Sequence, residues 1–376
     1  MNQLALKSAQ ALVSHTLISR KSQAVCCAQQ RGMSLVEIMI SLLIGAFLIG
    51  GVLQIFFSTK QTYRVQESVS RIQENGRFAM DFLMNDIRMA GFFGCKSRDF
   101  DIADVENELQ DQTNIAWDIT TPVQGFDNVA DTFSVFTNVV PNTDVILVRG
   151  LSESGTPLVA PYSDSAQMFV DTSFNADCPA SSATTCHEGE ILMVTDCTQG
   201  TIFQATQTTV VGGGTGIDVV HSANNTFTPG NASPATFSKS YGAGSQIAKL
   251  NTYGYYIRLN GANQPSLYRS RINLTGNKTN ALLAEELVEG IEDMQILYGE
   301  DTDNDGTPNY YVPAGTAGLT MNRVNSIRVS LLARTLDDNI TDQPLDYTYN
   351  GATTTPADRR MRRVFTSTIA VRNRLP

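Results

Sequence analysis

The chain has 376 residues, with 37 acidic and 27 basic side chains and a formal net charge of −10. A net acidic surface is poorly suited to general binding of DNA or anionic membranes, so no sequence-specific nucleic-acid partner is expected. The sequence contains no GxSxG or HExxH motif, and no catalytic acid or nucleophile pattern surrounds His187 or His221. An enzyme is therefore not expected, and both histidines are predicted to lie in surface loops.

The first predicted element is an apolar helix. Twenty residues, Ile38–Phe57, contain neither a charge nor a proline. At about 1.5 Å per residue this run measures about 30 Å, which is the thickness of the hydrocarbon core of a bilayer. Basic residues, the last of them Arg31, precede the run, which predicts a cytoplasmic N-terminus and an exported C-terminal part. An ordinary single-pass anchor would share these features.

Glu37 is the unexpected residue at the start of this helix. A carboxylate in a membrane helix costs about 2.5–3.5 kcal/mol at the centre and less near an end. Cleavage between Gly32 and Met33 would create an α-amine four residues before Glu37, and that amine is largely cationic at neutral pH. The new amine of the same chain or of a neighbouring subunit could neutralise Glu37, which would make this acid an assembly residue.

This segment resembles the class III signal of type IV prepilins, in which Gly precedes the cleavage site and Glu is the fifth residue of the mature chain. Met33 stands where such pilins usually have Phe. The resemblance implies a leader over residues 1–32 that a prepilin peptidase removes, methylation of the new amine at Met33, and a transmembrane helix over residues 33–57. Without the leader, 23 basic and 37 acidic side chains remain, a formal charge of −14.

An amphipathic continuation of the helix is predicted over residues 58–94, so that the whole helix extends from Ser34 to Ala90. Its apolar residues step by three and four positions and form one stripe. Glycines at 91 and 94 can end the helix. The members of the stripe are Val65, Val69, Ile72, Gly76, Ala79, Leu83, Ile87 and Ala90.

A β-rich globular domain is predicted over residues 95–376. The segments Tyr253–Leu259 and Pro265–Ser270 flank an Asn-Gly pair and predict a hairpin. Ala281–Ile291 predicts a short acidic helix, whereas residues 99–124, 178–244 and 337–357 are expected to be rich in loops. The other predicted strands are Thr143–Arg149, Ile191–Val194, Thr201–Val211, Ile217–Val220, Glu292–Tyr298, Val324–Arg334 and Arg363–Arg372. A long helix on a mostly antiparallel sheet is an α+β fold.

Four cysteines follow the leader: Cys95, Cys178, Cys186 and Cys197. An even number in an exported domain predicts two disulfides, for which three pairings are possible. The short separation of Cys178 and Cys186 favours a local loop, which would leave Cys95 to pair with Cys197. A zinc site is the alternative, but only His187 lies nearby and no CxxC occurs.

The acidic run Asp301–Gly306 is the sharpest polar motif. Its D-x-D-x-D-G spacing matches the first half of a calcium loop, with Asp301, Asp303 and Asp305 as candidate ligands of Ca²⁺. The twelfth position is Val312 instead of Glu, which excludes a standard EF-hand. An Asp/Asn/Gly turn between two strands is the alternative. The glycine-rich segment 211–216 lacks the Lys-Ser/Thr pair of a phosphate loop and is expected to be a turn.

Three segments are similar to the PilW-type minor pilins of type IV pili: Gly91–Cys95, Leu287–Asp301 and Arg362–Arg374. The resemblance implies a pilin-like fold and a structural role in priming pilus assembly with other minor pilins and the major pilin, at or near the fibre tip beside a large adhesin. Motility, adhesion and DNA uptake would depend on it. A J-type pseudopilin of a type II secretion system and a calcium-dependent binding module remain alternatives. The arginines at 359, 360, 362, 363, 372 and 374 are expected on a solvated strand face, with a local basic patch as the alternative.

Overall fold

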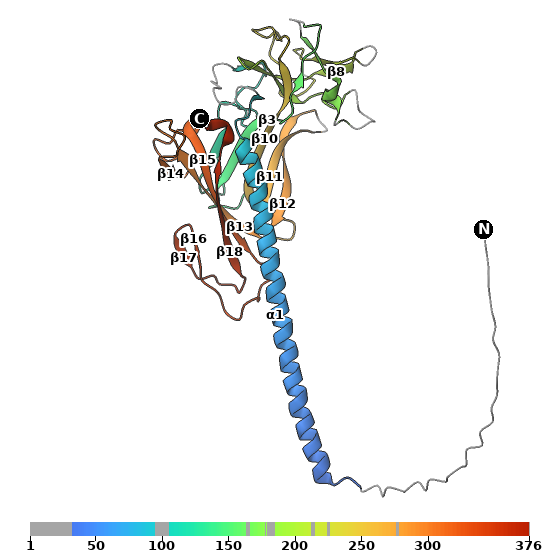
Figure 1. Cartoon of the computed structure of the whole chain (residues 1–376), viewed down its shortest axis with the longest axis vertical. Coiled ribbons are helices and arrows are strands. Elements are labelled where there is room, and N and C mark those ends of the chain that lie inside the picture. The colour runs from blue at the N-terminus through green and yellow to red at the C-terminus, as the bar shows by residue number, and fades with distance from the viewer. Residues whose placement is uncertain are drawn as a thin grey trace, which may run out of the picture. The chain divides into compact units, whose positions relative to one another are not determined.

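The computed structural model describes residues 32–94, 105–162, 166–176, 178, 185–211, 215–223, 226–275 and 278–375. The chain divides into two compact units, Met1–Thr59 and Lys60–Pro376. One long helix, α1 (Leu35–Met89), contributes to both units (Figure 1). Its bounds confirm the predicted helix within one residue at each end. The chain leaves the helix at Gly91, whose φ of 74° is a conformation that glycine adopts without strain.

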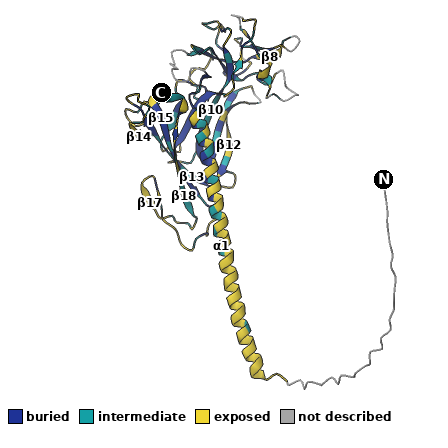
Figure 2. Ribbon diagram, in the orientation of Figure 1, coloured by how far each residue is buried: buried dark blue, intermediate teal, exposed yellow. Residues whose placement is uncertain are grey.

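The described part of the first unit is an apolar helix whose residues are nearly all exposed. The most apolar stretch of 18 residues in this helix has a mean hydropathy of 2.4, and none of its residues is buried. Figure 2 shows this part of α1 as exposed along nearly its whole length. The helix is long and apolar enough to cross a membrane.

In the second unit, α1 buries one face against a sheet. Every member of the predicted stripe is covered: Val65 and Val69 are half-buried, and the others are buried. Leu83 and Ile87 are fully inaccessible and share a core cluster with Tyr255, Ile296 and Val329. The amphipathic pattern therefore predicted the packed face correctly.

The largest sheet has nine strands and is antiparallel except where β1 pairs with β7. Its main path runs β1-β7-β6-β10-β11-β12; β3 and β4 also pair with β10, and β2 pairs with β3. The strands are β1 (Val105–Asn107), β2 (Val123–Phe126), β3 (Val145–Leu151), β4 (Thr156–Pro157), β6 (Ile191–Thr195), β7 (Gly200–Gln204), β10 (Gln246–Leu259), β11 (Pro265–Leu274) and β12 (Asn280–Glu289).

A second, four-stranded antiparallel sheet has the order β14-β13-β15-β18. Smaller sheets pair β5 with β9 and β8, and β16 with β17. Three 3₁₀ turns are described, η3 (Thr172–Asn175), η5 (Met321–Arg323) and η6 (Arg372–Arg374). The strands are β5 (Gln167–Val170), β8 (Gln207–Val210), β9 (Ile217–Val220), β13 (Ile291–Glu300), β14 (Tyr310–Val312), β15 (Val324–Arg334), β16 (Tyr347–Tyr349), β17 (Ala352–Thr354) and β18 (Arg362–Ala370). The fold is α+β and pilin-like: a long N-terminal helix with a mostly antiparallel β domain.

The predicted strands form, except that Thr201–Val211 is divided into β7 and β8, which belong to different sheets. The helix predicted at Ala281–Ile291 is wrong. Most of that segment is strand β12, which pairs antiparallel with β11. Its Ala, Leu and Glu residues favour helix, yet β11 supplies backbone partners and a cross-strand ion pair joins Arg269 to Glu285 at 2.6 Å. Tertiary pairing overrides the local preference here.

Two segments expected to be loops contain more structure than predicted. β1 and the first two residues of β2 lie within residues 99–124, and Trp117 in this segment is only 2% exposed. Residues 337–357 contain the hairpin β16–β17, whose turn is Asn350–Gly351 with positive φ at both residues. The Asn-Gly pair is a hairpin signal that sequence reasoning missed in this segment.

Candidate functional site

The candidate processing and assembly residues lie at the beginning of α1. The backbone carbonyl of Ser34 accepts the first helical hydrogen bond, from the N–H of Ile38 at 3.1 Å. Gly32 and Met33 therefore precede the helix. Glu37 lies in the first turn, where the N-terminal end of a helix favours a negative charge. Gly32, Met33 and Glu37 are exposed, and Glu37 forms no ion pair with any residue of the described part. The carboxylate is therefore available to a group outside this chain.

A buried polar contact fixes the C-terminal half of α1 to the large sheet. The hydroxyl of Tyr255 donates to Asp86 on α1, and Arg269 lies 3.3 Å from the same carboxylate. Burial raises the pKa of Asp86, against the hydrogen bond from Tyr255 and the charge of Arg269. Asp86 therefore links α1 to both β10 and β11.

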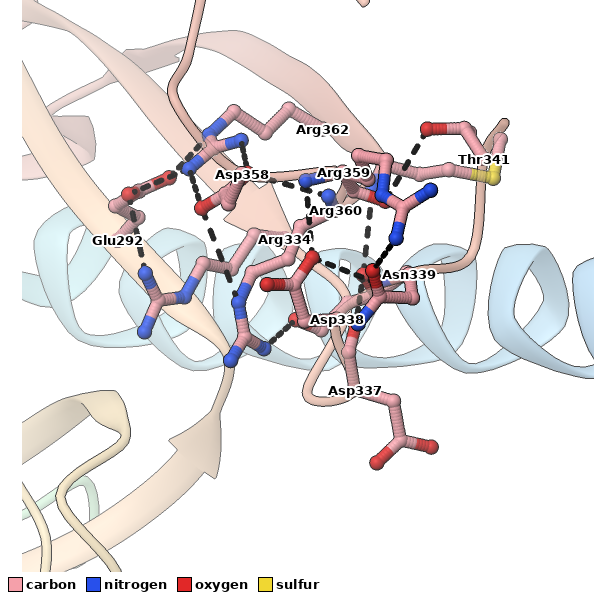
Figure 3. Close-up of polar contacts among 12 residues, drawn as sticks. Glu292, Arg334, Asp337, Asp338, Asn339, Thr341, Asp358, Arg359, Arg360 and Arg362 are labelled. Atoms are coloured by element: carbon pink, nitrogen blue, oxygen red, sulfur yellow. Dashed lines mark hydrogen bonds and ion pairs between the residues drawn. The ribbon is translucent and has the colours of Figure 1, made fainter. Parts of the chain in front are cut away.

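A second polar cluster, the arginine network, lies where β13 begins, β15 ends and β18 begins (Figure 3). Arg362 contacts Glu292 at 2.7 Å and Asp358 at 2.7 Å. Arg334 lies 3.3 Å from Glu292. The hydrogen bonds from Arg362 lower the pKa of Asp358 to about 2, which keeps it ionised. We define the arginine network as Glu292, Arg334, Asp358, Arg360 and Arg362.

The expectation of a solvated arginine face near the C-terminus is only partly correct. Arg359, Arg363 and Arg372 are exposed, but the side chain of Arg362 is only 6% exposed. Arg360 donates to the carbonyl of Thr335 at 2.8 Å. Arg374 donates to the carbonyl of Met321 at 3.0 Å, and burial lowers the pKa of Arg374 to about 10. Arg360, Arg362 and Arg374 therefore hold the fold together and do not form a free basic patch.

Sequence reasoning missed Glu292 and Arg334 as members of the arginine network. Both lie at strand ends, Glu292 near the start of β13 and Arg334 as the last residue of β15. A charge at the end of an apolar strand was a usable signal, because two such ends in neighbouring strands can come together. The register of β13 on β15, which brings them together, could not be read from the sequence.

The acidic loop lies between β13 and β14 and brings its three carboxylates together. Asp301, Asp303 and Asp305 each place an oxygen within 4.8 Å of the others. Asp301 is 7% exposed and accepts the N–H groups of Asp305 at 3.2 Å and Gly306 at 2.8 Å. Positive φ at Asn304 and Gly306 closes the turn. Geometry of this kind serves a closed Asx turn and a small cation equally well.

Asn325 borders the acidic loop from β15. It is 2% exposed and donates from Nδ2 to Asp301 at 3.1 Å. Its buried Oδ1 has no hydrogen-bond partner among the described residues. An unsatisfied amide oxygen beside carboxylates is a donor of the kind that Ca²⁺ prefers. The residues present are therefore compatible with a calcium ion.

Cys178 and Cys186 are joined in a disulfide, with their Cα atoms 5.8 Å apart. Cys95 lies outside the described residues, so its pairing with Cys197 stays a prediction. His187 adjoins the disulfide, with Nε2 2.7 Å from the carbonyl of Phe174 and Nδ1 2.9 Å from Glu190.

The two histidines lie in loops as predicted, but the expectation that they are at the surface is wrong. His187 is 8% exposed and His221 is 1% exposed. His221 stacks on the ring of Phe237 at 4.0 Å between centroids. Both imidazoles are packed inside the domain because their planar rings fill space beside other rings and polar groups.

Two family models match the chain. The model described as type IV pilus-assembly protein W matches residues 254–373, and the model described as the prokaryotic N-terminal methylation motif matches residues 27–53. No curated protein and no solved structure matches. The first match runs from within β10 to within η6 and includes the arginine network and the acidic loop. The second covers Gly32, Met33 and Glu37.

The methylation motif together with an apolar helix long enough to span a bilayer indicates anchoring in the inner membrane before assembly. Type IV pilins assemble with other pilins after processing by a prepilin peptidase. The two matches together support a type IV pilin that is similar to the PilW family over residues 254–373; the proteins of that family are structural components of pili and not enzymes.

Proposed function

We propose that this protein is a minor pilin that co-assembles with other minor pilins, primes pilus assembly and sits at or near the pilus tip. There it would help to present a large tip adhesin, and motility, attachment and DNA uptake would depend on it. Before assembly its N-terminus is cytoplasmic, and its β domain lies in the periplasm. The observation that carries the proposal is the exposed Glu37 in the first turn of an apolar helix, directly after Gly32 and Met33.

The chemistry of this segment explains how assembly would proceed. Cleavage after Gly32 exposes an amine on Met33, and that cation neutralises a Glu37 carboxylate that is costly in lipid. When the amine belongs to a neighbouring subunit, the pair fixes how far one helix slides along the other. Uncharged helix surface alone offers no comparable preference for one position, because lipid tails are as apolar as leucine.

Exchange of Glu37 for Gln tests this role, because Gln removes the charge and keeps the size. We expect the Glu37→Gln protein to insert and to be processed, but to be missing from sheared pili on immunoblots. Glu37→Asp, which keeps the charge, should recover part of the incorporation, and Gln54→Ala, in the same apolar helix, should assemble normally. Normal incorporation of the Gln variant would refute the assembly role of Glu37.

The cleavage site is tested separately. Exchange of Gly32 for Leu should leave an unprocessed precursor, visible as a larger band on a gel. Mass spectrometry of the wild-type protein from cells should find a chain that begins at Met33 with a methyl group on its amine. Functional protein that still carries residues 1–32 would contradict the proposed processing.

We propose calcium binding by the acidic loop as a second, accessory function. The convergence of Asp301, Asp303 and Asp305, beside the unsatisfied Oδ1 of Asn325, favours it. Bound calcium would stiffen the loop between β13 and β14 and so shape a surface for a partner. Calcium at about one hundred times its dissociation constant would add about 2.7 kcal/mol to the free energy of unfolding. A thermal melt of the full chain that calcium does not shift, or shifts equally in Asp303→Asn, would argue for a plain turn.

A further inference from the structure

A polar cavity of about 180 Å³ lies between α1 and the segment that follows β15, within the second unit. Arg64, Arg71 and Asn75 line it from α1, and Arg334, Thr335 and Asp337 line it from the opposite side. A volume of this size holds a small charged group together with several waters. The cavity is therefore large enough for the end of a side chain that comes from outside.

Three guanidinium groups face this cavity with few partners of their own. Arg64 is exposed and forms no ion pair within the described ranges. Arg71 pairs with Glu67 at 2.7 Å, but the side chains are 64% and 44% exposed, so water competes with this pair. Both charges on the α1 wall are therefore available to an incoming anion.

Arg334 is the most buried of the three, with its side chain 17% exposed. Its terminal nitrogens make only long contacts, 3.3 Å to Glu292 and 3.4 Å to Gln264. Its buried Nε has no hydrogen-bond partner among the residues that the structure describes. Burial and the neighbouring charges of Arg360 and Arg362 lower the pKa of Arg334, against the attraction of Glu292. An additional carboxylate would give the guanidinium of Arg334 a closer partner of opposite charge.

The acids that line the cavity do not fill this need. Glu67 is engaged by Arg71, and the side chain of Asp337 points away from the other side chains drawn in Figure 3. Three guanidinium groups and two carboxylates line the cavity, so its net charge is about +1. That charge matches a singly charged carboxylate better than a phosphate dianion.

We propose that this cavity receives the carboxylate of an Asp or Glu side chain from a neighbouring pilin subunit. The inference rests on the proposed function, since it supposes that the protein is assembled beside other pilins. A planar guanidinium binds a carboxylate through two parallel hydrogen bonds, which fixes the orientation of the partner as well as its position. The cavity would thus add a second point of registration, outside the membrane, to the one at Glu37.

A carbodiimide coupling in piliated cells tests the proposal, because this reagent joins a lysine amine directly to a carboxylate in contact with it. In full-length Arg64→Lys and Arg71→Lys variants, we expect a covalent product with another pilin, and mass spectrometry should place the link on an Asp or Glu of that partner. Arg77→Lys is the matched control, since Arg77 is 83% exposed on α1 and does not line the cavity. No partner link should form there.

Charge reversal gives an independent readout. Arg64→Glu with Arg71→Glu should reduce the amount of protein in sheared pili by about tenfold, while Arg77→Glu leaves it unchanged. Links confined to acids of the same chain, or equal incorporation of the double variant, would overturn the cavity proposal and leave the proposed function intact. A lipid phosphate in the cavity would give no carboxylate link and would overturn it as well. Absence of the wild-type protein from pili would instead refute the proposed function.

Discussion

The ring of Phe365 lies directly against the backbone of Gly76. A Cβ atom added at Gly76 would meet Cε2 of Phe365 at 2.2 Å, well inside any tolerated contact. Gly76 is buried in the C-terminal half of α1, and Phe365 belongs to β18. A glycine inside a helix costs about 0.5–1 kcal/mol relative to alanine, so its presence here needs a reason. The reason is the close approach of the helix to the four-stranded sheet.

Exchange of Gly76 for Ala should therefore destabilise the domain, although alanine favours helix. Overpacking of a well-filled site costs about 1–3 kcal/mol, which exceeds the gain of helix propensity. We expect a lower midpoint in thermal unfolding of the full-length protein in detergent, followed by circular dichroism.

Two controls make this prediction specific. Gly76→Ala combined with Phe365→Leu should recover part of the loss, because the smaller side chain vacates the space that Cβ needs. Gly45→Ala should not lower the midpoint, since nothing lies within 4 Å of a Cβ built at Gly45. A more stable Gly76→Ala protein would show that the helix and β18 separate more easily than the structure indicates.

Among the residues that the structure describes, Arg149 is a buried cation that forms no ion pair with a carboxylate. It is 1% exposed on β3 and donates to the carbonyls of Thr121 at 2.6 Å and Ile115 at 2.7 Å. It also donates to Oε1 of Gln124 at 2.9 Å. Burial lowers the pKa of Arg149 to about 10, which still leaves it charged at neutral pH. The residue thus holds the segment 115–124 against the large sheet.

We expect Arg149→Lys to lower the free energy of unfolding by about 2–4 kcal/mol, because one ammonium cannot reach all of these acceptors and leaves buried carbonyls unsatisfied. Limited proteolysis should show earlier cleavage within residues 115–124. Arg258→Lys, on the neighbouring strand β10, is a control for an arginine whose cation stacks on a ring, that of Tyr268 at 5.3 Å. Equal effects of the two exchanges would contradict the special role of Arg149.

Glu292 and Glu67 allow a comparison between a half-buried and an exposed acid of similar chemistry. Glu292 is 25% exposed and contacts both Arg334 and Arg362, whereas Glu67 is 44% exposed and contacts Arg71 alone. Exchange of Glu292 for Gln should cost about 1–3 kcal/mol, because it leaves Arg334 without a charged partner. Exchange of Glu67 for Gln should cost less than about 0.5 kcal/mol. Chemical denaturation of both variants measures the difference, and similar values would show that the arginine network adds little stability.

The sequence predicted the parts of the fold that depend on local pattern. The period of apolar residues gave the buried face of α1, and β-branched runs gave β3, β13, β15 and β18. Contacts between distant segments were out of reach, because no local pattern reports which strand ends meet. The arginine network depends on the register in which β13 pairs with β15. The fit of Phe365 on Gly76 depends on the position of α1 over β18.

The candidate site shows the same division. Gly32, Met33 and Glu37 could be singled out because their meaning lies in spacing along one helix. The alternation of Asp301, Asp303 and Asp305 likewise indicated that their carboxylates converge. Asn325 could not be found, because it reaches Asp301 from β15, another strand of the same sheet. The burial of His187 and His221 also depends on packing that polar sequence context does not reveal.

Three acids, one buried and two half-buried, predict how stability depends on pH. Burial raises the pKa of Asp144 to about 7, with a contribution from the charges of Asp127 and Asp293, against the N–H groups of Asn128 and Ile296. Burial also raises the pKa of Asp293 to about 6 and that of Glu108 to about 7. In the unfolded chain such groups titrate at about 4. At these three groups the folded state therefore binds more protons than the unfolded chain between about pH 4 and pH 7.

Because the folded state binds more protons at these three acids, their contribution to the free energy of unfolding falls as the pH rises from about 4 to about 7. We expect the melting midpoint of the full-length protein in detergent to decrease from about pH 5 to about pH 7.5. Asp358 acts in the opposite direction, but its pKa of about 2 confines its effect to more acidic solutions. Asp144→Asn should lower the midpoint at every pH. The two oxygens of Asp144 accept the backbone N–H groups of Asn128 and Ile296, and the amide nitrogen of the new side chain would face one of these donors without being able to accept its hydrogen bond. It should also make the pH dependence shallower, since Asp144 has the largest change in pKa of these three acids. A midpoint that rises between pH 5 and pH 7.5 would mean that these carboxyls are ionised in the folded state and paired with donors more strongly than their burial opposes.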